Sequence, residues 1–236
     1  MKAPDNAKAN AALAACDLVR SGMKLGLGTG STAKLVVEEL GRRLAEGRVR
    51  DLRATATSEA TAALARSVGI PLNDLDDLAP LDLTIDGADE VDPSWNLIKG
   101  AGGALLREKI IAQASLQECI AVDESKLVAR LGQKAALPVE VVRMGWKTQV
   151  EFLRSLGGAA VLRVVYGAPV VTDEGNYLLD VRFDHAMGQA ALRDPLTLQT
   201  RLLARAGIVE TGLFLGLTHI LVVGRSGGAT VERKSQ

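Results

Sequence analysis

The chain has 236 residues, 47% of them hydrophobic, and its 28 Lys and Arg residues balance 28 Asp and Glu residues. This size can bury one or two globular cores, while the zero net charge excludes a strong overall attraction to nucleic acid or to an anionic membrane. With no apolar run of membrane-spanning length, no signal peptide and two isolated cysteines, we expect a cytoplasmic protein with neither a nucleic-acid nor a membrane partner.

The first predicted elements are a helix over residues 5–20, with Asp5 or Asn6 as its N-cap, and a short strand over residues 23–27. Lys8 lies in the first turns of that helix, where a cation opposes the helix dipole. An exposed lysine and a lysine beside an anionic ligand therefore both remain open for this position.

The loop GTGSTA follows the first strand and precedes a second helix. It lacks the third glycine of the dinucleotide-binding motif and the lysine of a P-loop. The hydroxyl and N–H groups of Thr29, Gly30, Ser31 and Thr32 at a helix N-terminus suit a single phosphate. A plain helix cap by Ser31 or Thr32 would explain the same pattern.

A strand over residues 52–57 and a helix capped by Ser58 lead to the segment that we expect to carry the chemistry. Its first part is a buried parallel strand that ends in DGAD and brings Asp86 and Asp89 to the carboxyl end, where open α/β sheets bind ligands. Lys99 then precedes a glycine-rich stretch at the start of a helix, which leaves backbone N–H groups to meet an anion.

The helix predicted near residues 104–114 places Glu108 in an apolar strip, since the residues three and four positions away are Ala104, Leu105, Ile111 and Ala112. A carboxylate in that environment must be paired, protonated or functional. The alternative is a surface carboxylate that pairs with its neighbours Arg107 or Lys109.

The regular alternation of strands and helices continues with a strand over residues 118–122 that ends in DESK. In a parallel doubly wound sheet, loops that follow strands gather at one edge. We therefore expect four loops to converge at the carboxyl ends of the strands: residues 28–32, 86–90, 99–103 and 123–126.

From about residue 137 the predicted order is βαββαβ, which is typical of a ferredoxin-like domain, with a hairpin turn at DEGN. An apolar strand near residues 219–223 is expected to rejoin the first sheet, and the polar tail after it to form a hairpin or to fray. The fold class predicted is therefore α/β, with a Rossmann-like doubly wound domain (1–133 plus 208–236) and a smaller ferredoxin-like α/β domain (134–207) inserted near the C-terminus. His185 and His219 are assigned no role, and the chain offers no plausible metal ligand set.

The segments GTGSTA, DGADEVDP, KGAGGALLREK, DESK, LPVEV and VTDEGN, in this order and spacing, resemble type A ribose-5-phosphate isomerase over nearly the whole chain. The resemblance implies a metal-free and cofactor-free isomerase of ribose 5-phosphate and ribulose 5-phosphate in the non-oxidative pentose phosphate pathway. It also implies a homodimer or a dimer of dimers. The chain departs from the family at Ala101, where a third consecutive glycine is usual, and alanine would be strained if that position requires a positive φ.

The resemblance implies that Glu108 is the general base, with Asp86, Asp89 and Lys99 as the other catalytic residues. The substrate-binding residues that it implies are Lys8, Thr29, Gly30, Ser31, Thr32, Asp86, Gly87, Ala88, Asp89, Lys99, Gly100, Ala101, Gly102 and Lys126.

Two alternative functions remain open from the sequence. One is a sugar-phosphate-sensing domain, which is normally fused to a DNA-binding module that this sequence does not show. The other is a sugar-phosphate deaminase or an acyl-group transferase on a related fold, which would require different loop chemistry from DGAD and KGAGG.

Overall fold

The computed structural model describes residues 6–183 and 191–234, and it divides into two compact units. Unit 1 comprises Met1–Ala88, Arg107–Lys126 and Leu217–Gln236, and unit 2 comprises Asp89–Leu106 and Leu127–Gly216. The two domains expected from the sequence, with boundaries near residues 133 and 208, stay a prediction.

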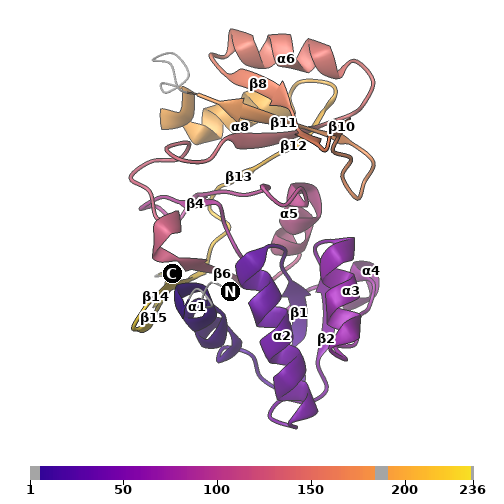
Figure 1. Cartoon of the computed structure of the whole chain (residues 1–236), viewed down its shortest axis with the longest axis vertical. Coiled ribbons are helices and arrows are strands. Elements are labelled where there is room, and N and C mark those ends of the chain that lie inside the picture. Colours follow the sequence, from indigo (N-terminus) through magenta and orange to yellow (C-terminus); the bar gives the residue numbers. More distant parts are fainter. Residues whose placement is uncertain (1–5, 184–190, 235–236) are drawn as a thin grey trace. The chain divides into compact units, whose positions relative to one another are not determined.

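Unit 1 is built on a six-stranded sheet with the order β15-β14-β6-β3-β1-β2 (Figure 1). The strands are β1 (Lys24–Leu27), β2 (Arg53–Ala56), β3 (Leu83–Asp86), β6 (Glu118–Asp123), β14 (Ile220–Arg225) and β15 (Gly228–Arg233). All neighbours pair in parallel except β14 and β15. The order reverses between β1 and β3, because β2 lies on one side of β1 and β3 on the other. Open α/β sheets bind ligands outside the carboxyl ends of their strands at such a switch point.

The helices of this region are α1 (Asn6–Cys16), α2 (Ser31–Ala45), α3 (Glu59–Ser67), α4 (Leu75–Leu78), α5 (Leu105–Gln113) and the short 3₁₀-helix η1 (Glu124–Lys126). Strand side chains alternate between the two faces of the sheet. Leu25 and Ile85 belong to the hydrophobic core with α1 and α2. Gly26 and Thr84 face the other side, where a Cβ added to Gly26 would lie 2.7 Å from Ile111 of α5.

Helix α1 is shorter than the predicted helix over residues 5–20, so that predicted end is wrong. Beyond Cys16 the N–H groups of Leu18 and Val19 bond to carbonyls only three residues back, which is a tighter turn than an α-helix makes. The chain then turns at Gly22, which has a positive φ of 83°. Asp5, one of the two predicted caps, lies outside the described residues, and Asn6 is already helical, so it is not the cap.

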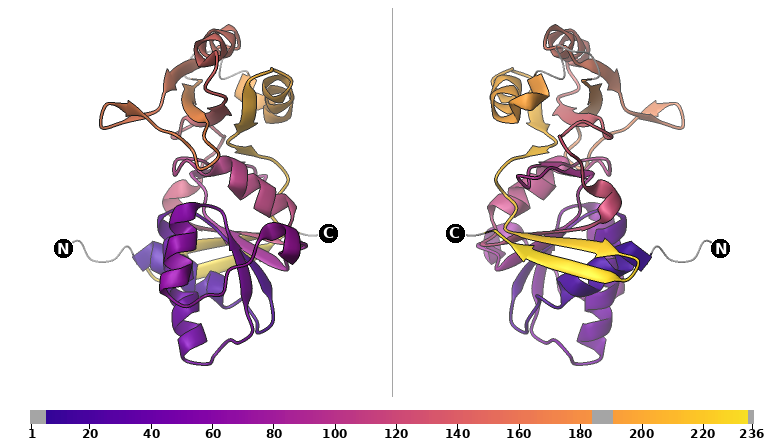
Figure 2. Two further views of the ribbon diagram at one scale, coloured as in Figure 1. Left: turned by 90° about the vertical axis from the view of Figure 1, so that its right-hand side faces the viewer. Right: turned by 90° about the vertical axis from the view of Figure 1, so that its left-hand side faces the viewer.

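The polar tail forms the hairpin that was one of its two predicted alternatives. Strands β14 and β15 pair from Ile220 to Arg233, and Figure 2 shows this yellow hairpin beside the indigo α1. Gly224 makes the close packing possible, since a Cβ there would lie 1.8 Å from the carbonyl oxygen of Ala7. The predicted return of the strand near residues 219–223 to the first sheet is confirmed, because β14 pairs in parallel with β6.

Unit 2 contains a four-stranded antiparallel sheet with the order β12-β7-β11-β8. Its elements in chain order are β7 (Leu137–Val141), α6 (Trp146–Ser155), β8 (Ala159–Leu162), β11 (Tyr177–Arg182), α8 (Pro195–Leu203) and β12 (Ile208–Thr211). This is the βαββαβ plan with the ferredoxin-like strand order, so that prediction is confirmed. The predicted strand over residues 159–165 is broken after β8, because β9 (Val164–Val165) leaves β11 and pairs with β10 (Ala168–Pro169).

A three-stranded antiparallel sheet in unit 2 was not predicted. It is formed by β4 (Glu90–Val91), β5 (Leu97–Ile98) and β13 (Leu213–Phe214). Asp92 closes the turn between β4 and β5, since its Oδ1 accepts from the N–H groups of Ser94 (2.8 Å) and Asn96 (2.9 Å). Residues 99–103 therefore follow a strand of this small sheet, and the expectation that they follow a strand of the doubly wound sheet is wrong.

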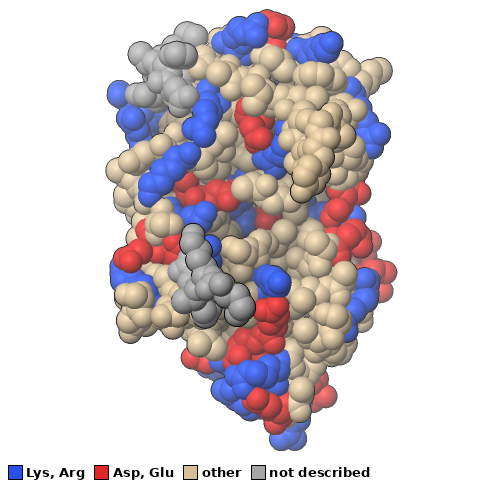
Figure 3. Space-filling view, viewed as in Figure 1, with Lys and Arg blue, Asp and Glu red and all other residues tan. Residues whose placement is uncertain are grey.

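Lys and Arg side chains lie among Asp and Glu side chains on the face shown in Figure 3, in keeping with the balanced composition. Within residues 6–183 and 191–234, no helix combines the length and the apolar character that crossing a membrane requires.

Glu140 of β7 is a buried carboxyl, with 1% of its surface exposed. Its Oε1 accepts from Thr172 Oγ1 (2.8 Å) and Asn176 Nδ2 (2.9 Å), whereas the buried Oε2 has no hydrogen-bond partner among the described residues. Burial raises the pKa of this carboxyl by more than the two hydrogen bonds lower it, and the charges of Glu174 and Glu210 add to the rise.

We expect Glu140→Gln to gain thermal stability relative to the parent as the pH rises. A carboxyl whose pKa is higher in the folded state contributes stability that is complete below the unfolded pKa and is lost as the pH rises through the folded pKa. The neutral amide avoids that loss, so the difference in Tm between variant and parent should grow between about pH 4 and pH 8. Glu151→Gln, at an exposed position, is the control. A difference that shrinks with rising pH would contradict the expectation.

Candidate functional site

The loop between β1 and α2 presents the start of a helix that no side chain caps. Gly30 is the N-cap with a φ of 113°, and no side-chain hydrogen bond closes the first turn. The alternative that Ser31 or Thr32 is a plain cap is therefore wrong. The first N–H groups of an α-helix have no partner within the helix, and together with the helix dipole they attract an anion.

Asp86, the last residue of β3, ties this loop to the DGAD segment. The residue is 1% exposed, and its Oδ1 accepts from the N–H groups of Thr29 (3.0 Å) and Gly87 (2.7 Å). The carboxylate can approach this closely because residue 28 is glycine, where a Cβ would lie 2.2 Å from Asp86 Oδ1. Two of the predicted loops are therefore held together at the switch point between β1 and β3.

The hydroxyl of Thr29, which the sequence assigned to the substrate, contacts three other hydroxyls within unit 1. Its Oγ1 lies 2.7 Å from Thr57 Oγ1, 2.8 Å from Ser58 Oγ and 3.1 Å from Thr61 Oγ1. Sequence reasoning recognised Ser58 only as the cap of α3, a role that its hydrogen bond from the Thr61 N–H (3.1 Å) confirms. It gave no functional role to any of these three partners, because only the folded sheet brings β2 beside β1.

Residues 123–126 lie at the same edge of the sheet, because β6 is the neighbour of β3. Asp123 Oδ1 accepts from the N–H (3.0 Å) and from the hydroxyl of Ser125, which shapes the turn into η1. Lys126 is half-buried at the end of this turn. Within unit 1, three of the four predicted loops thus follow three adjacent parallel strands, β1, β3 and β6. Lys8 lies in α1, which packs on the same sheet.

Glu108 lies in the first turn of α5 and is 5% exposed. The neighbouring Arg107 forms an ion pair with Glu59, in which Arg107 Nη1 lies 2.8 Å from Glu59 Oε1. The alternative that Glu108 is a surface carboxylate is therefore wrong. A carboxylate and the adjacent Lys109, which is 3% exposed, are both withdrawn from water here. Burial of ionisable groups is costly and marks candidate functional sites.

In unit 2, Asp89 and the KGAGG segment are joined by a direct hydrogen bond. Asp89 Oδ2 accepts from the N–H of Ala101 at 2.9 Å. Lys99 is 2% exposed, and its Nζ lies 5.4 Å from the centre of the Phe214 ring, within reach of a cation–π interaction. The carboxylate and the buried ammonium predicted as catalytic therefore both belong to the segment that this hydrogen bond joins.

Ala101 fits its position without strain. The residues of this segment with positive φ are Gly100 (107°) and Gly103 (85°), whereas Ala101 is not among the residues with positive φ. The strain considered for the departure from the family pattern is therefore absent, since the left-handed conformations fall on glycines.

Arg163 is a further residue that sequence reasoning missed. Its Nη1 donates to the carbonyl oxygens of Gly100 (2.9 Å) and Ala101 (3.1 Å), while Asp180 holds the guanidinium from the other side. A paired guanidinium with fixed donors anchors backbone carbonyls well. No motif links positions so far apart along the chain, so the sequence carried no local signal for this contact.

Other groups capable of chemistry lie outside these loops. Both cysteines are buried free thiols, and burial raises the pKa of Cys16 to about 12, so it is not poised as a nucleophile. The Nδ1 of His219 accepts from the N–H of Glu118 at 3.1 Å, whereas His185 lies outside the described residues. In the part of the chain that the structure describes, no group of three or more His, Cys, Asp or Glu residues could hold a metal ion.

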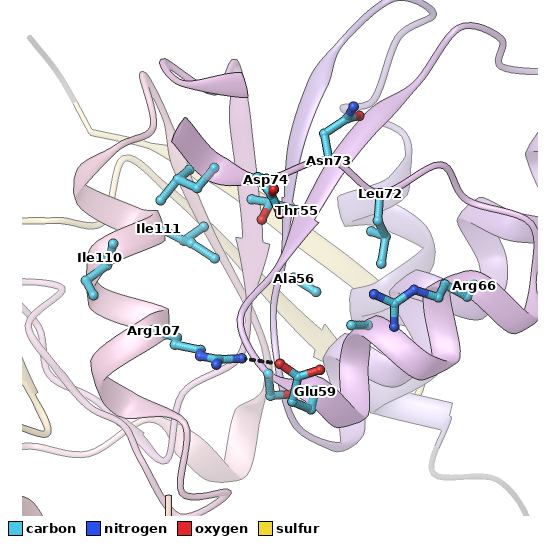
Figure 4. Close-up of a pocket in the computed structure, with 13 residues that line it drawn as sticks. Thr55, Ala56, Glu59, Arg66, Leu72, Asn73, Asp74, Arg107, Ile110 and Ile111 are labelled. Carbon is cyan, nitrogen blue, oxygen red and sulfur yellow. Dashed lines mark hydrogen bonds and ion pairs between the residues drawn. The ribbon is translucent and has the colours of Figure 1, made fainter. Parts of the chain in front are cut away.

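A pocket of about 380 Å³ opens beside the edge strand β2 in unit 1. Figure 4 shows α5, with Arg107, Ile110 and Ile111, on one side and α3, with Arg66, on the other, and the ion pair between Arg107 and Glu59 at one end. None of the residues that line it was predicted as a site residue. The pocket borders the loop before α2, since Ser58 both lines it and accepts from Thr29 Oγ1.

Comparison with known proteins gives a consistent result. The family model for ribose 5-phosphate isomerase A (phosphoriboisomerase A) matches residues 53–228. Ribose-5-phosphate isomerase A of Chloroflexus aurantiacus is 51% identical over 222 residues, which cover 93% of this chain and 90% of that protein. The structure of ribose 5-phosphate isomerase A from Methanocaldococcus jannaschii is 36% identical with a TM-score of 0.90, covering 98% of this chain and 100% of that one. A D-ribose-5-phosphate isomerase in complex with phospho-erythronic acid is also 36% identical with a TM-score of 0.90, covering 96% and 97%.

We expect Gly28→Ala to lower the free energy of unfolding by about 1–3 kcal/mol, the usual cost of overpacking. The added Cβ would lie 2.2 Å from Asp86 Oδ1 and 2.5 Å from Asp86 Cα, and the backbone of β3 cannot easily move away. Urea unfolding measures the loss. Gly227→Ala is the matched control, since nothing lies within 4 Å of its added Cβ. Equal stability of the two variants would contradict the close approach seen here.

Proposed function

The chain belongs to the ribose 5-phosphate isomerase A family, and from that premise we propose how its own residues perform the reaction. The enzyme is an aldose–ketose isomerase that interconverts D-ribose 5-phosphate and D-ribulose 5-phosphate. Relatives of this one activity match the chain over most of its length, so the sensing, deaminase and acyl-transfer alternatives are not favoured. We place the reaction in the non-oxidative pentose phosphate pathway.

Glu108 is the general base of the proposed mechanism. The reaction requires a group that removes the proton from C2 of the open-chain sugar and returns it to C1 through an enediolate. A buried carboxylate in the first turn of a helix suits this task, because the helix dipole favours negative charge there. This burial is the single observation that carries the assignment.

Lys99 and the two loop aspartates interact with the oxygen atoms of the sugar. The buried ammonium of Lys99 offsets the negative charge that develops on the enediolate. Asp86 and Asp89 hold substrate hydroxyls and assist ring opening or the proton transfer between O1 and O2. Both carboxylates are already oriented by backbone N–H groups, which fixes the geometry in which they meet a hydroxyl.

The phosphate binds at the start of α2. The uncapped N–H groups at Gly30–Thr32 and the exposed hydroxyl of Ser31 face an anion, and Lys126 and Lys8 supply positive charge. Gly87, Ala88, Gly100, Ala101 and Gly102 complete the substrate-binding loops. Binding energy from the phosphate, which does not react, orients the sugar for proton transfer.

We also propose a cytoplasmic homodimer or dimer of dimers. Two free thiols fit a reducing compartment. Val161, Val164, Val165 and Tyr166 of unit 2 are 49–104% exposed, and such apolar surface is commonly buried against another subunit. The balanced charge supports no nucleic-acid or membrane partner.

We expect Glu108→Gln to lower kcat by about 10²–10⁴-fold while the affinity for ribose 5-phosphate stays within several-fold. Glutamine keeps the size of the side chain but cannot accept the C2 proton. Solvent-deuterium exchange at the sugar carbon, together with calorimetric binding, separates the two effects. Glu59→Gln, which removes the partner of the neighbouring Arg107, is the control and should retain exchange.

Asp86→Asn and Asp89→Asn test the rival bases in the same exchange assay. Exchange that persists in Glu108→Gln and vanishes in Asp86→Asn would transfer the role of base to Asp86. Loss of substrate binding in Glu108→Gln would instead make Glu108 a structural residue.

We expect full activity after exhaustive chelation, because the proposed mechanism uses only carboxylates and ammonium groups. The measurement is ribulose 5-phosphate formation in EDTA-treated buffer, compared with the same enzyme after addition of Mg²⁺ or Zn²⁺. Activity lost on chelation and restored by a divalent ion would show that a metal takes part.

A further inference from the structure

Four hydroxyl groups form a continuous chain of hydrogen bonds behind the loop that precedes α2. Thr29 Oγ1 donates to Ser58 Oγ (2.8 Å), Ser58 Oγ donates to Thr61 Oγ1 (3.1 Å), and Thr61 Oγ1 donates to the carbonyl oxygen of Gly28 (3.0 Å). Each hydroxyl has a single proton. Thr57 must therefore donate to Thr29 across their 2.7 Å contact, since the proton of Thr29 is already used.

This chain is withdrawn from water. Thr57 is 0% exposed, Ser58 is 6% exposed and Thr61 is 7% exposed. Successive hydrogen bonds in a region of low dielectric polarise and strengthen one another, and a buried group that loses its partner is costly. The four residues therefore act as one unit.

The hydroxyl chain contacts both residues of one peptide group, the one that joins Gly28 to Thr29. The carbonyl of Gly28 accepts from Thr61, and the side chain of Thr29 is held by Thr57 and Ser58, while the N–H of Thr29 donates to Asp86 Oδ1. The orientation of the next residues, which present their N–H groups at the start of α2, follows from this fixed peptide. The hydroxyl of Thr29 thereby holds the loop in position instead of binding the substrate.

We propose that Thr57, Ser58 and Thr61 are positioning residues that hold the loop of residues 28–32 in its phosphate-binding conformation through Thr29 and Gly28. The inference rests on the proposed assignment of that loop to the phosphate. Because the N–H of Thr29 also orients Asp86, the chain links the phosphate end of the site to a carboxylate at the reacting end.

The test is Thr61→Val, which keeps the shape of the side chain and removes its donor to the Gly28 carbonyl. Because the variant loses the hydrogen bonds of Thr61 Oγ1 to Gly28 and from Ser58, we expect KM for ribose 5-phosphate and the competitive inhibition constant of inorganic phosphate both to rise by at least about tenfold. Thr61→Ser restores the hydroxyl and should return both constants to within about twofold of the parent.

Thr55→Val is the matched control. Thr55 lies on β2, the strand that leads to Thr57, is 8% exposed and appears in the pocket wall in Figure 4, but no hydrogen bond of its hydroxyl exists within residues 6–183 and 191–234. A purely structural role for Thr61 would lower Tm without moving the phosphate constant. A folded Thr61→Val with the inhibition constant of the parent and of Thr55→Val would overturn the proposal.

Two further variants keep the outcome decisive. If Thr61→Val does not fold, Thr57→Val removes the first donor of the chain and should raise the phosphate constant, and an unchanged constant there would also overturn the proposal. The double variant Ser31→Ala with Thr32→Ala tests the loop assignment itself. Unchanged constants in both the double variant and Thr61→Val would refute the phosphate loop, whereas raised constants in the double variant with none in Thr61→Val would refute only the positioning chain.

Discussion

The hydrogen bonds of the Asp86 carboxylate hold together the loops that form the candidate site of unit 1. One oxygen accepts the N–H of Thr29 from the loop after β1 and the N–H of Gly87 from its own loop. The contact forms only because Gly28 lacks a Cβ, since that atom would lie 2.2 Å from the carboxylate. Two loops that leave neighbouring parallel strands are thereby fixed at the point where the strand order reverses, which is where open α/β sheets bind ligands.

Buried charge is the cost of this arrangement. Asp86, Lys99, Glu108 and Lys109 are each at most 5% exposed, in a protein whose total charge is balanced and whose face shown in Figure 3 mixes both signs. Withdrawing ionised groups from water disfavours folding unless their surroundings compensate, and natural chains keep such groups where chemistry requires them. In unit 1, burial of the apolar core residues from the sheet, α1 and α2 provides stability that offsets this cost.

Local pattern in the sequence predicts much of this fold and part of its site. The period of two in β3 and the order βαββαβ are visible because each strand buries a continuous apolar face, and the family motifs indicate Asp86 and Glu108. The three-stranded sheet was missed because β4 and β5 have only two residues each, which is too short for any period. The end of α1 was misplaced because residues 17–20 are compatible with a helix locally. Arg163 and the hydroxyl chain act on backbone far away in sequence, and only tertiary structure brings such partners together.

The same hydrogen bonds bear on which carboxylate can be the base. A general base gains and loses a proton in every turnover, and a protonated carboxyl accepts hydrogen bonds less well than a carboxylate. Protonation of Asp86 would weaken its bonds to the N–H groups of Thr29 and Gly87, and protonation of Asp89 would weaken its bond to Ala101. Either event would loosen a loop in the middle of the reaction. Glu108 lies in a helix whose backbone is held by its own i to i−4 hydrogen bonds, so in the proposed mechanism the helix that carries the base keeps its backbone in place while the proton is transferred.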